Sequence, residues 1–343
     1  MKLILKVLLI NLIAIQVNAQ SNGNVKNIRK ALQSIAAEYS PTAHIVFTKV
    51  GNYKYQKYIY HKTKSVVLNY YNVPVHESTH HYNDLIRKRK SPKEFIEKNT
   101  GAGYFIYPNI EIGMANFPVY NSIELNDVIP DSIQVKLDNY ETYIGGNDIK
   151  NLSSQINGIF GLMDEFTAYS TGAKSQLELY NYYLANSKTG FENIEWWGSF
   201  INNLAGCISD YYEFKLFIHW YLAHSKNAHF EEYEKIMANK KLRLVFTLAD
   251  QNYNQVIKAY YEKVAFICEA TQKYANSLRF DYYENQTYKS LMTYKGLSIS
   301  SVSYVFEEEM EFSRKLYELL DQSILNDFRI EGATKENYRN YLE

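Results

Sequence analysis

The spacing of apolar residues divides the chain into a short mixed part followed by a long helical part. Residues 20–39 have apolar positions at helical spacing and predict a helix that ends before Pro41. Three following segments alternate or are rich in β-forming residues, and each predicts a strand: 44–50, 53–60 and 65–71. Gly51-Asn52 is typical of the turn in a hairpin. The start of the chain is therefore expected to be mixed α/β.

Beyond this part the pattern predicts one further helix, a region of short strands, and then long helices. The first helix is expected to begin at Pro74, because proline is tolerated at the first helical position, and to end before Pro92. Residues 101–125 mix Gly and Pro with β-branched and aromatic residues, which indicates short strands and loops. Long amphipathic helices are predicted at 156–186, 208–224, 250–279 and 305–327. The expected fold class is α+β, with a small mixed α/β N-terminal subdomain (20–150) and a mainly helical C-terminal subdomain (151–343) on either side of a cleft.

Residues 1–19 predict a signal peptide that is not part of the fold. A basic start is followed by an apolar stretch at residues 7–17 and by Ala19, which is compatible with cleavage before Gln20. The apolar stretch is too short to span a bilayer, which needs about twenty residues. We therefore expect an exported protein, periplasmic or extracellular, that is soluble and has no stable membrane insertion after signal removal. A retained anchor is the alternative.

Charge and cysteine content exclude several classes of protein. Lys plus Arg and Asp plus Glu both number 37, so the chain lacks the basic excess of nucleic-acid-binding proteins. Cys207 and Cys268 are too few for a cysteine-rich scaffold or an all-cysteine zinc site. The sequence decides neither whether these two are bridged nor what the oligomeric state is.

The residues that carry chemistry lie in the segment 73–82, which reads VPVHESTHHY. His76 and His80 are four residues apart, on one face of the predicted helix, so both imidazoles can bind one zinc ion. Glu77 lies beside that face, where a carboxylate can accept a proton from a metal-activated water. A helix that begins at Pro74 would place His76 in its first turn.

A catalytic zinc site needs a third protein ligand. A third histidine in the same helix is absent, because the corresponding positions are Asn83 and Ile86. Glu165 is the best candidate, since it lies in a segment with the apolar periodicity of a buried helix, where carboxylates are seldom found without a partner or a metal. Asp164 or another acidic residue is the alternative ligand.

The motif HESTH followed by DEFTAY resembles the gluzincin group of zinc metallopeptidases. In that group HExxH supplies two ligands and a later helical glutamate supplies the third. The resemblance covers two short segments and indicates no specific family within the group. It implies a zincin-like fold, a Zn²⁺ cofactor held by His76, His80 and Glu165, and Glu77 as the catalytic base.

The resemblance leaves the residues around the ligands open. Some members of the group have an acidic residue four positions after the ligand glutamate, but here that position is Tyr169. Asp164 or Asp84 is therefore expected to orient a ligand histidine. Residues 103–112 are a possible edge strand for an extended peptide substrate. Four residues of a later helix are candidates to stabilise the oxyanion: His219, His224, Tyr211 and Tyr212.

These features predict an exported zinc-dependent peptidase that acts on a peptide or protein. Two alternatives stay open. One is a binding or structural protein in which zinc is only a staple or is absent, and the other is a zinc amidase that acts on a non-protein amide. The sequence indicates neither the cleavage specificity nor whether cleavage is internal or terminal.

Overall fold

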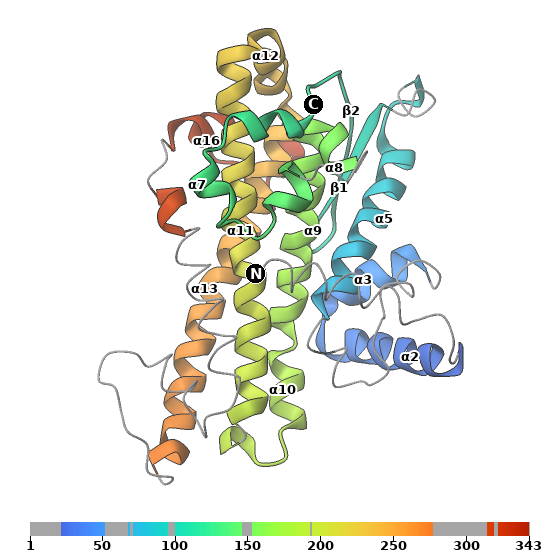
Figure 1. The fold of residues 1–343 in the computed structure, drawn as a ribbon. Helices are drawn as coiled ribbons and strands as arrows, with labels where there is room; N and C mark the ends of the chain where they lie inside the picture. Colours follow the sequence, from blue (N-terminus) through green and yellow to red (C-terminus); the bar gives the residue numbers. More distant parts are fainter. Residues whose placement is uncertain are drawn as a thin grey trace.

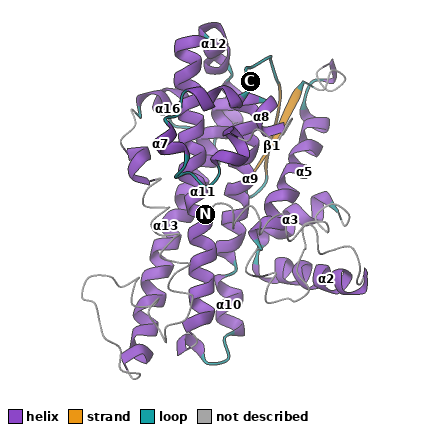
Figure 2. Cartoon of the chain, in the orientation of Figure 1, coloured by secondary structure: helices purple, strands orange, loops and turns teal. Residues whose placement is uncertain are grey.

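The computed structural model describes residues 22–51, 68, 71–94, 100–145, 153–192, 194–276, 314–318 and 322–342. The predicted signal peptide at 1–19 and the predicted strand at 53–60 lie outside these residues. Of the predicted strand at 65–71 only Leu68 and Tyr71 are described, and neither is in a strand. The described chain is mostly helical with one small antiparallel sheet, which is a mixed α+β fold (Figures 1 and 2).

In chain order, the two strands lie between an early group of helices and a longer late group. The helices are α2 (Asn22–Tyr39), α3 (Pro41–Val50), α5 (Asn72–Lys90), α7 (Asp131–Gln134), α8 (Ser153–Ile156), α9 (Gly158–Glu178), α10 (Tyr180–Asn186), α11 (Ile194–Ala228), α12 (Phe230–Ala238), α13 (Lys240–Asn276) and α16 (Ser323–Phe328). The strands are β1 (Gly101–Ile106) and β2 (Ile110–Ala115). Short 3₁₀ turns are η2 (Ser122–Asp127), η4 (Gly190–Glu192) and η6 (Tyr338–Tyr341), and η3 (Glu141–Gly145) is a π-helical turn.

The predicted strand at 44–50 is wrong, because this segment belongs to α3. Ser40 is the N-cap of α3 and its side chain accepts a hydrogen bond from the Ala43 N–H, while Pro41 occupies the first turn. Serine followed by proline is a strong start signal for a helix. Gly51 ends the helix with a positive φ of 74°, a conformation that glycine adopts readily. The helix-capping residues Ser40 and Gly51 therefore favour a helix here, although the alternation of the residues between them is typical of a strand.

The β1–β2 hairpin lies between α5 on one face and α9 on the other (Figure 1). Gly103 pairs with Gly113, and a Cβ atom on Gly103 would lie 2.2 Å from the backbone nitrogen of Arg87. The two glycines therefore allow the backbone of α5 to lie directly on the sheet. On the opposite face the Tyr104 hydroxyl donates to the Phe160 carbonyl of α9 at 3.0 Å. The short strands predicted within residues 101–125 are confirmed.

Helix α9 is the centre of the fold, since it packs against α5, α11 and α13. Buried residues from both predicted subdomains belong to one hydrophobic cluster, which extends from Ile28 to Ala333. The predicted helix at 208–224 is confirmed within α11, and that at 250–279 is confirmed as far as α13 is described. The predicted helix at 156–186 is divided into α9 and α10 at Leu179. Most of the predicted helix at 305–327 lies outside the described residues, which include only 314–318 and 322–327 of it. Cys207 is a buried free cysteine. Among the residues described, no helix has both the length and the apolar character needed to cross a membrane.

Candidate metal centre

Helix α5 holds His76 and His80 on its buried side. The helix begins at Asn72 and not at Pro74, so His76 is its fifth residue and lies beyond the first turn. Pro74 is the third residue of this helix. Proline has no backbone N–H group and fits there, because the first four N–H groups of a helix have no partner within the helix. The two Nε2 atoms of the histidines are 3.0 Å apart. The i, i+4 spacing thus aims both imidazoles at one point.

Glu165 reaches the same point from α9. Its Oε2 atom lies 3.4 Å from His76 Nε2 and 3.3 Å from His80 Nε2. Ligand atoms of a tetrahedral zinc ion are about 3.3 Å apart, given bonds of about 2.0–2.2 Å. The three donor atoms therefore have the spacing of one face of such a tetrahedron. Glu165 Oε2 is buried without a hydrogen-bond partner in the described chain, and a divalent cation would satisfy it.

A carboxylate orients the ring of His80. Asp164 Oδ2 accepts from His80 Nδ1 at 2.7 Å, which leaves the lone pair of Nε2 directed toward His76 and Glu165 when the ring is neutral. Asp164 Oδ1 in turn accepts from Asn83 Nδ2 at 2.7 Å. Of the two carboxylates that the sequence suggested for this position, the structure places Asp164 next to the histidine.

Asn83 is a site residue that the sequence did not identify. Besides holding Asp164, its Oδ1 accepts from the backbone N–H of Phe105 in β1 at 2.7 Å. One buried amide therefore connects the sheet, α5 and the carboxylate that orients His80. Its position, three residues after His80 on the same helical face, is the only signal of this role in the sequence.

The charges of the cluster are coupled. Burial lowers the pKa of His80, but the carboxylates of Glu165 and Asp164 outweigh it and hold that pKa well above its usual range. Burial raises the pKa of Glu165, but His80 and His76 outweigh it and hold that pKa well below its usual range. The metal-free cluster is thus an imidazolium–carboxylate pair, and a proton competes with a metal ion for the same donor atoms.

Two tyrosines cover the histidine side of the site. The Tyr169 ring meets the His76 ring edge-on at a centroid distance of 4.3 Å, and its hydroxyl lies 3.1 Å from that of Tyr143. Tyr143 comes from the π-helical turn η3, and such turns are frequent at functional sites. Burial raises the pKa of Tyr143, helped by nearby Glu165 and Glu77, so its phenol is protonated at neutral pH. No sequence signal distinguishes Tyr143 among 33 tyrosines.

The cluster opens into a cleft of about 590 Å³. The walls come from α5, the first four residues of β1, η3, α8 and the beginning of α9. Glu77 lines this cleft beside the histidines and is partly exposed, and so is His81. The arrangement places a metal-type donor set and one further carboxylate in a space that a substrate can enter.

Comparison of the chain with protein-family models, with curated proteins and with solved structures finds no match.

Asp84, the other carboxylate considered for orienting a histidine, lies at the edge of the cleft. Its Oδ1 accepts from Arg87 Nη2 at 2.6 Å and its Oδ2 from Lys88 Nζ at 2.5 Å. These two cations outweigh burial and lower the pKa of Asp84. Asp84 therefore forms a charged network on the surface of α5 and is not paired with either histidine.

The four candidates for stabilising an oxyanion are not among the residues that line the cleft. The Tyr211 hydroxyl donates to Asp250 at 2.8 Å, and Tyr212 packs near Tyr317 at a centroid distance of 6.2 Å. His219 is buried on α11, and His224 lies with a separate group of polar residues. Within the described chain, the tyrosine that borders both the cleft and the cluster is Tyr143.

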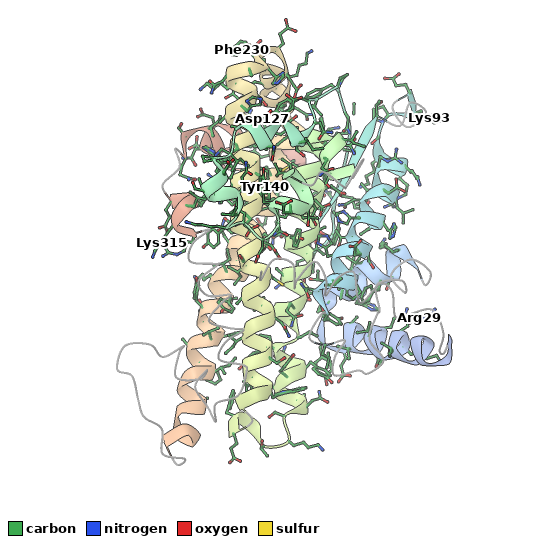
Figure 3. The ribbon with its side chains drawn as sticks, in the orientation of Figure 1. Arg29, Lys93, Asp127, Tyr140, Phe230 and Lys315 are labelled. Atoms are coloured by element: carbon green, nitrogen blue, oxygen red, sulfur yellow. The ribbon has the colours of Figure 1, made fainter. Side chains whose placement is uncertain are left out.

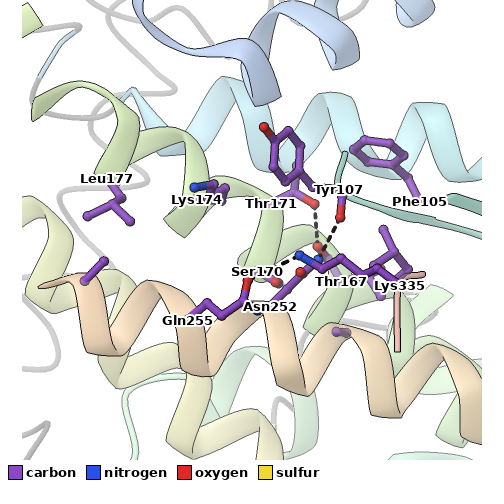
Figure 4. A pocket seen from close by; sticks show the side chains of 13 residues that line it. Phe105, Tyr107, Thr167, Ser170, Thr171, Lys174, Leu177, Asn252, Gln255 and Lys335 are labelled. Atoms are coloured by element: carbon purple, nitrogen blue, oxygen red, sulfur yellow. Dashed lines mark hydrogen bonds between the residues drawn. The ribbon is translucent and has the colours of Figure 1, made fainter. Parts of the chain in front are cut away.

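A smaller pocket of about 100 Å³ lies between α9, α13 and the end of β1 (Figure 4). It shares no lining residue with the cleft. Lys174 and Lys335 border it, and Asn252 donates from Nδ2 to the Tyr107 carbonyl at 3.1 Å. These contacts attach the tip of the hairpin to α13.

Proposed function

We propose that this chain is an exported zinc-dependent hydrolase that cleaves peptide bonds, with His76, His80 and Glu165 as ligands and Glu77 as general base. One observation carries the proposal: the three donor atoms are 3.0–3.4 Å apart at a cleft that also exposes Glu77. The basic and apolar start of the sequence supports export.

The mechanism assigns the proton transfers to Glu77. Zinc, when bound, supplies a positive charge that polarises a carbonyl group and acidifies water. The Glu77 side chain accepts a proton from the attacking water and then returns it to the amine of the leaving group. Hydroxide adds to the carbonyl carbon, the C–N bond breaks, and the products are a carboxylate and an amine.

Tyr143 is the donor that we assign to the developing oxyanion. Its phenol is protonated at neutral pH, lines the cleft and lies close enough to Glu165 and Glu77 to feel their charges. A donor placed before reaction stabilises the negative charge that forms on the carbonyl oxygen. Tyr169 and Phe214 pack against the Tyr143 ring and hold it in place.

An extended peptide fits beside β1. Residues 101–104 of this strand line the cleft next to the cluster, so their backbone groups can pair with a substrate strand. The following N–H group, that of Phe105, already donates to Asn83. We therefore infer that substrate pairing ends before Phe105.

Two other functions are kept as alternatives. A catalytic zinc site keeps one position open to water and substrate, and the three donors that converge here border a cleft. This observation favours catalysis over a zinc staple. A zinc amidase that acts on a non-protein amide would use the same residues, and only the substrate distinguishes it from a peptidase.

The test is the turnover of a fluorescence-quenched peptide library by wild type and Glu77→Gln, with zinc content measured for both. We expect Glu77→Gln to retain zinc and to lose about 10²–10⁴-fold in turnover, the usual contribution of a general base. Glu192→Gln is a matched control, because Glu192 is exposed on η4 and does not line the cleft. Full turnover by Glu77→Gln would contradict the proposal. Turnover of a non-protein amide alone would favour the amidase, and bound zinc without any turnover would favour the staple.

A further inference from the structure

A second group of metal-type donors lies outside the cleft. Glu124 of η2, His224 of α11 and His229 at the corner before α12 bring their donor atoms within 4.8 Å of one another. His229 Nε2 and Glu124 Oε2 are 3.2 Å apart, close to the spacing of ligand atoms around zinc. Phe230, labelled in Figure 3, follows His229 and marks this end of the molecule.

One tyrosine holds both imidazole rings of this group. Tyr120 stacks on His229 with centroids 4.5 Å apart and an interplanar angle of 17°, and it meets His224 edge-on at 5.4 Å. Tyr120 is itself fixed, since its hydroxyl donates to the Tyr221 carbonyl at 2.7 Å and its ring stacks on the Tyr221 ring. The two histidines are therefore positioned before any ligand binds, which lowers the entropy lost on binding.

The surroundings of the group favour a cation. Glu232, a second carboxylate nearby, accepts from the Tyr120 N–H at 3.0 Å and from the Tyr221 hydroxyl at 3.0 Å. The Glu232 N–H donates to the His229 carbonyl at 3.0 Å, so this acidic residue lies beside the group, and a negative group there favours a cation.

We propose that Glu124, His224 and His229 form a second metal site, distinct from the cleft, that takes a zinc-type divalent ion. Two imidazoles favour zinc and similar transition metals over Mg²⁺ or Ca²⁺, which prefer oxygen ligands. Three protein ligands leave one position for water. The proposal does not depend on catalysis in the cleft.

A metal ion bound at this site connects η2 to the corner between α11 and α12. Segment η2 packs against η3, and Ser122 of η2 donates from Oγ to the Tyr143 carbonyl at 3.4 Å. A metal ion bound by Glu124 therefore steadies the turn that carries Tyr143. The second site acts as a staple for one wall of the cleft.

The experiment is a titration of the metal-free full chain with Zn²⁺ by calorimetry, repeated with Co²⁺ followed by its absorption spectrum. Wild type is expected to bind two equivalents. Loss of a residue that hydrogen-bonds to a metal ligand costs roughly ten- to hundredfold in metal affinity, and loss of a ligand should cost at least as much. His229→Ala and Glu124→Gln are therefore each expected to weaken the binding of one equivalent by at least this factor. His44→Gln, which changes an exposed histidine of α3, is the matched control and keeps both equivalents.

This experiment tests the two metal sites separately. His76→Ala removes the cleft equivalent and leaves the other, so loss of the cleft site alone does not affect the proposal for the second site. Melting temperatures of the metal-free variants, compared with wild type, show that each variant is folded. Binding by His229→Ala and Glu124→Gln that equals wild type in number and affinity would overturn the proposal. A single wild-type equivalent that disappears in His76→Ala would also overturn it.

Discussion

The two donor groups contain the same chemistry, two histidines and one glutamate, but differ in their surroundings. In the cleft, the side chains of His76 and Glu165 are about 10% exposed, at 11% and 10%. In the second group, the side chains of His229 and Glu124 are 34% and 46% exposed. The cleft group is held by hydrogen bonds from three elements, whereas the second is held by one stacked tyrosine.

This difference indicates what catalysis requires beyond the ligands. Glu77 and Tyr143 border the cleft group, which supplies a base and a hydrogen-bond donor beside an open space. The linings of the cleft and of the smaller pocket between α9 and α13 include none of Glu124, His224 and His229. We therefore propose hydrolysis for the cleft group and only a structural role for the second group.

The largest effect that separates the two groups is expected for Tyr143→Phe. Loss of the donor to the oxyanion should lower turnover by about 10²–10³-fold while zinc stays bound. Tyr120→Phe is the matched control at the second group, because it keeps the ring that holds His224 and His229 and is expected to leave turnover unchanged. The measurement is steady-state kinetics with zinc analysis. Wild-type turnover by zinc-loaded Tyr143→Phe would remove Tyr143 from the mechanism.

A smaller effect is expected when the carboxylate that orients His80 is neutralised. Asp164→Asn should weaken zinc binding in the cleft by about 10–100-fold and leave the second site unchanged. Asp84→Asn serves as the control. The ion pairs of Asp84 with Arg87 and Lys88 are partly exposed at the surface of α5, so they should contribute less than about 1 kcal/mol to the free energy of unfolding and nothing to zinc affinity. Chelator competition measures the affinities. Equal weakening by both variants would contradict the distinction between the two carboxylates.

The smallest expected effect concerns Glu213, a buried acidic residue that belongs to neither donor group. Glu213 accepts from the backbone N–H groups of Asp138 and Asn139 at 2.9 and 2.8 Å, and burial raises its pKa to about 8. The folded state therefore holds a proton that the unfolded state releases near its ordinary pKa of 4.5. Stability is expected to fall as pH rises from about 5 to 8, with a slope of up to about 1.4 kcal/mol per pH unit.

Glu213→Gln removes this titration and is expected to flatten the dependence. Urea unfolding across the same range of pH gives the free energy of unfolding for both proteins. A slope in Glu213→Gln that equals that of wild type would show that the proton is bound elsewhere.

Much of the fold could be predicted from local patterns. Apolar periodicity identified the helical C-terminal part, and Gly- and Pro-rich composition identified the hairpin region. The error at 44–50 arose because Ser40 and Pro41 act together as a helix start, while the alternation of the following residues suggested a strand. A cap is a local signal, so this error was avoidable. The close contact of Gly103 with α5 depends on tertiary packing, so it could not be predicted from the sequence.

The donor set in the cleft could be predicted because two ligands, His76 and His80, are four residues apart in one helix, and the third comes from the acidic pair Asp164-Glu165 in a later apolar helix. The structure confirms that His76, His80 and Glu165 lie close enough to bind a metal ion. Asn83 and Tyr143 could not be assigned, since their roles depend on contacts with β1 and with Tyr169. The second group was missed for the same reason: Glu124 lies 105 residues before its partner His229.

Whether the cleft binds zinc through His76, His80 and Glu165 is decided by the zinc content of purified protein. The measurement compares Glu124→Gln, in which the proposed second site is weakened, with the same protein carrying Glu165→Ala, each after exposure to zinc and removal of the excess. We predict one zinc per chain in the first protein and little or none in the second. Equal zinc in both, or none in the first, would contradict the claim.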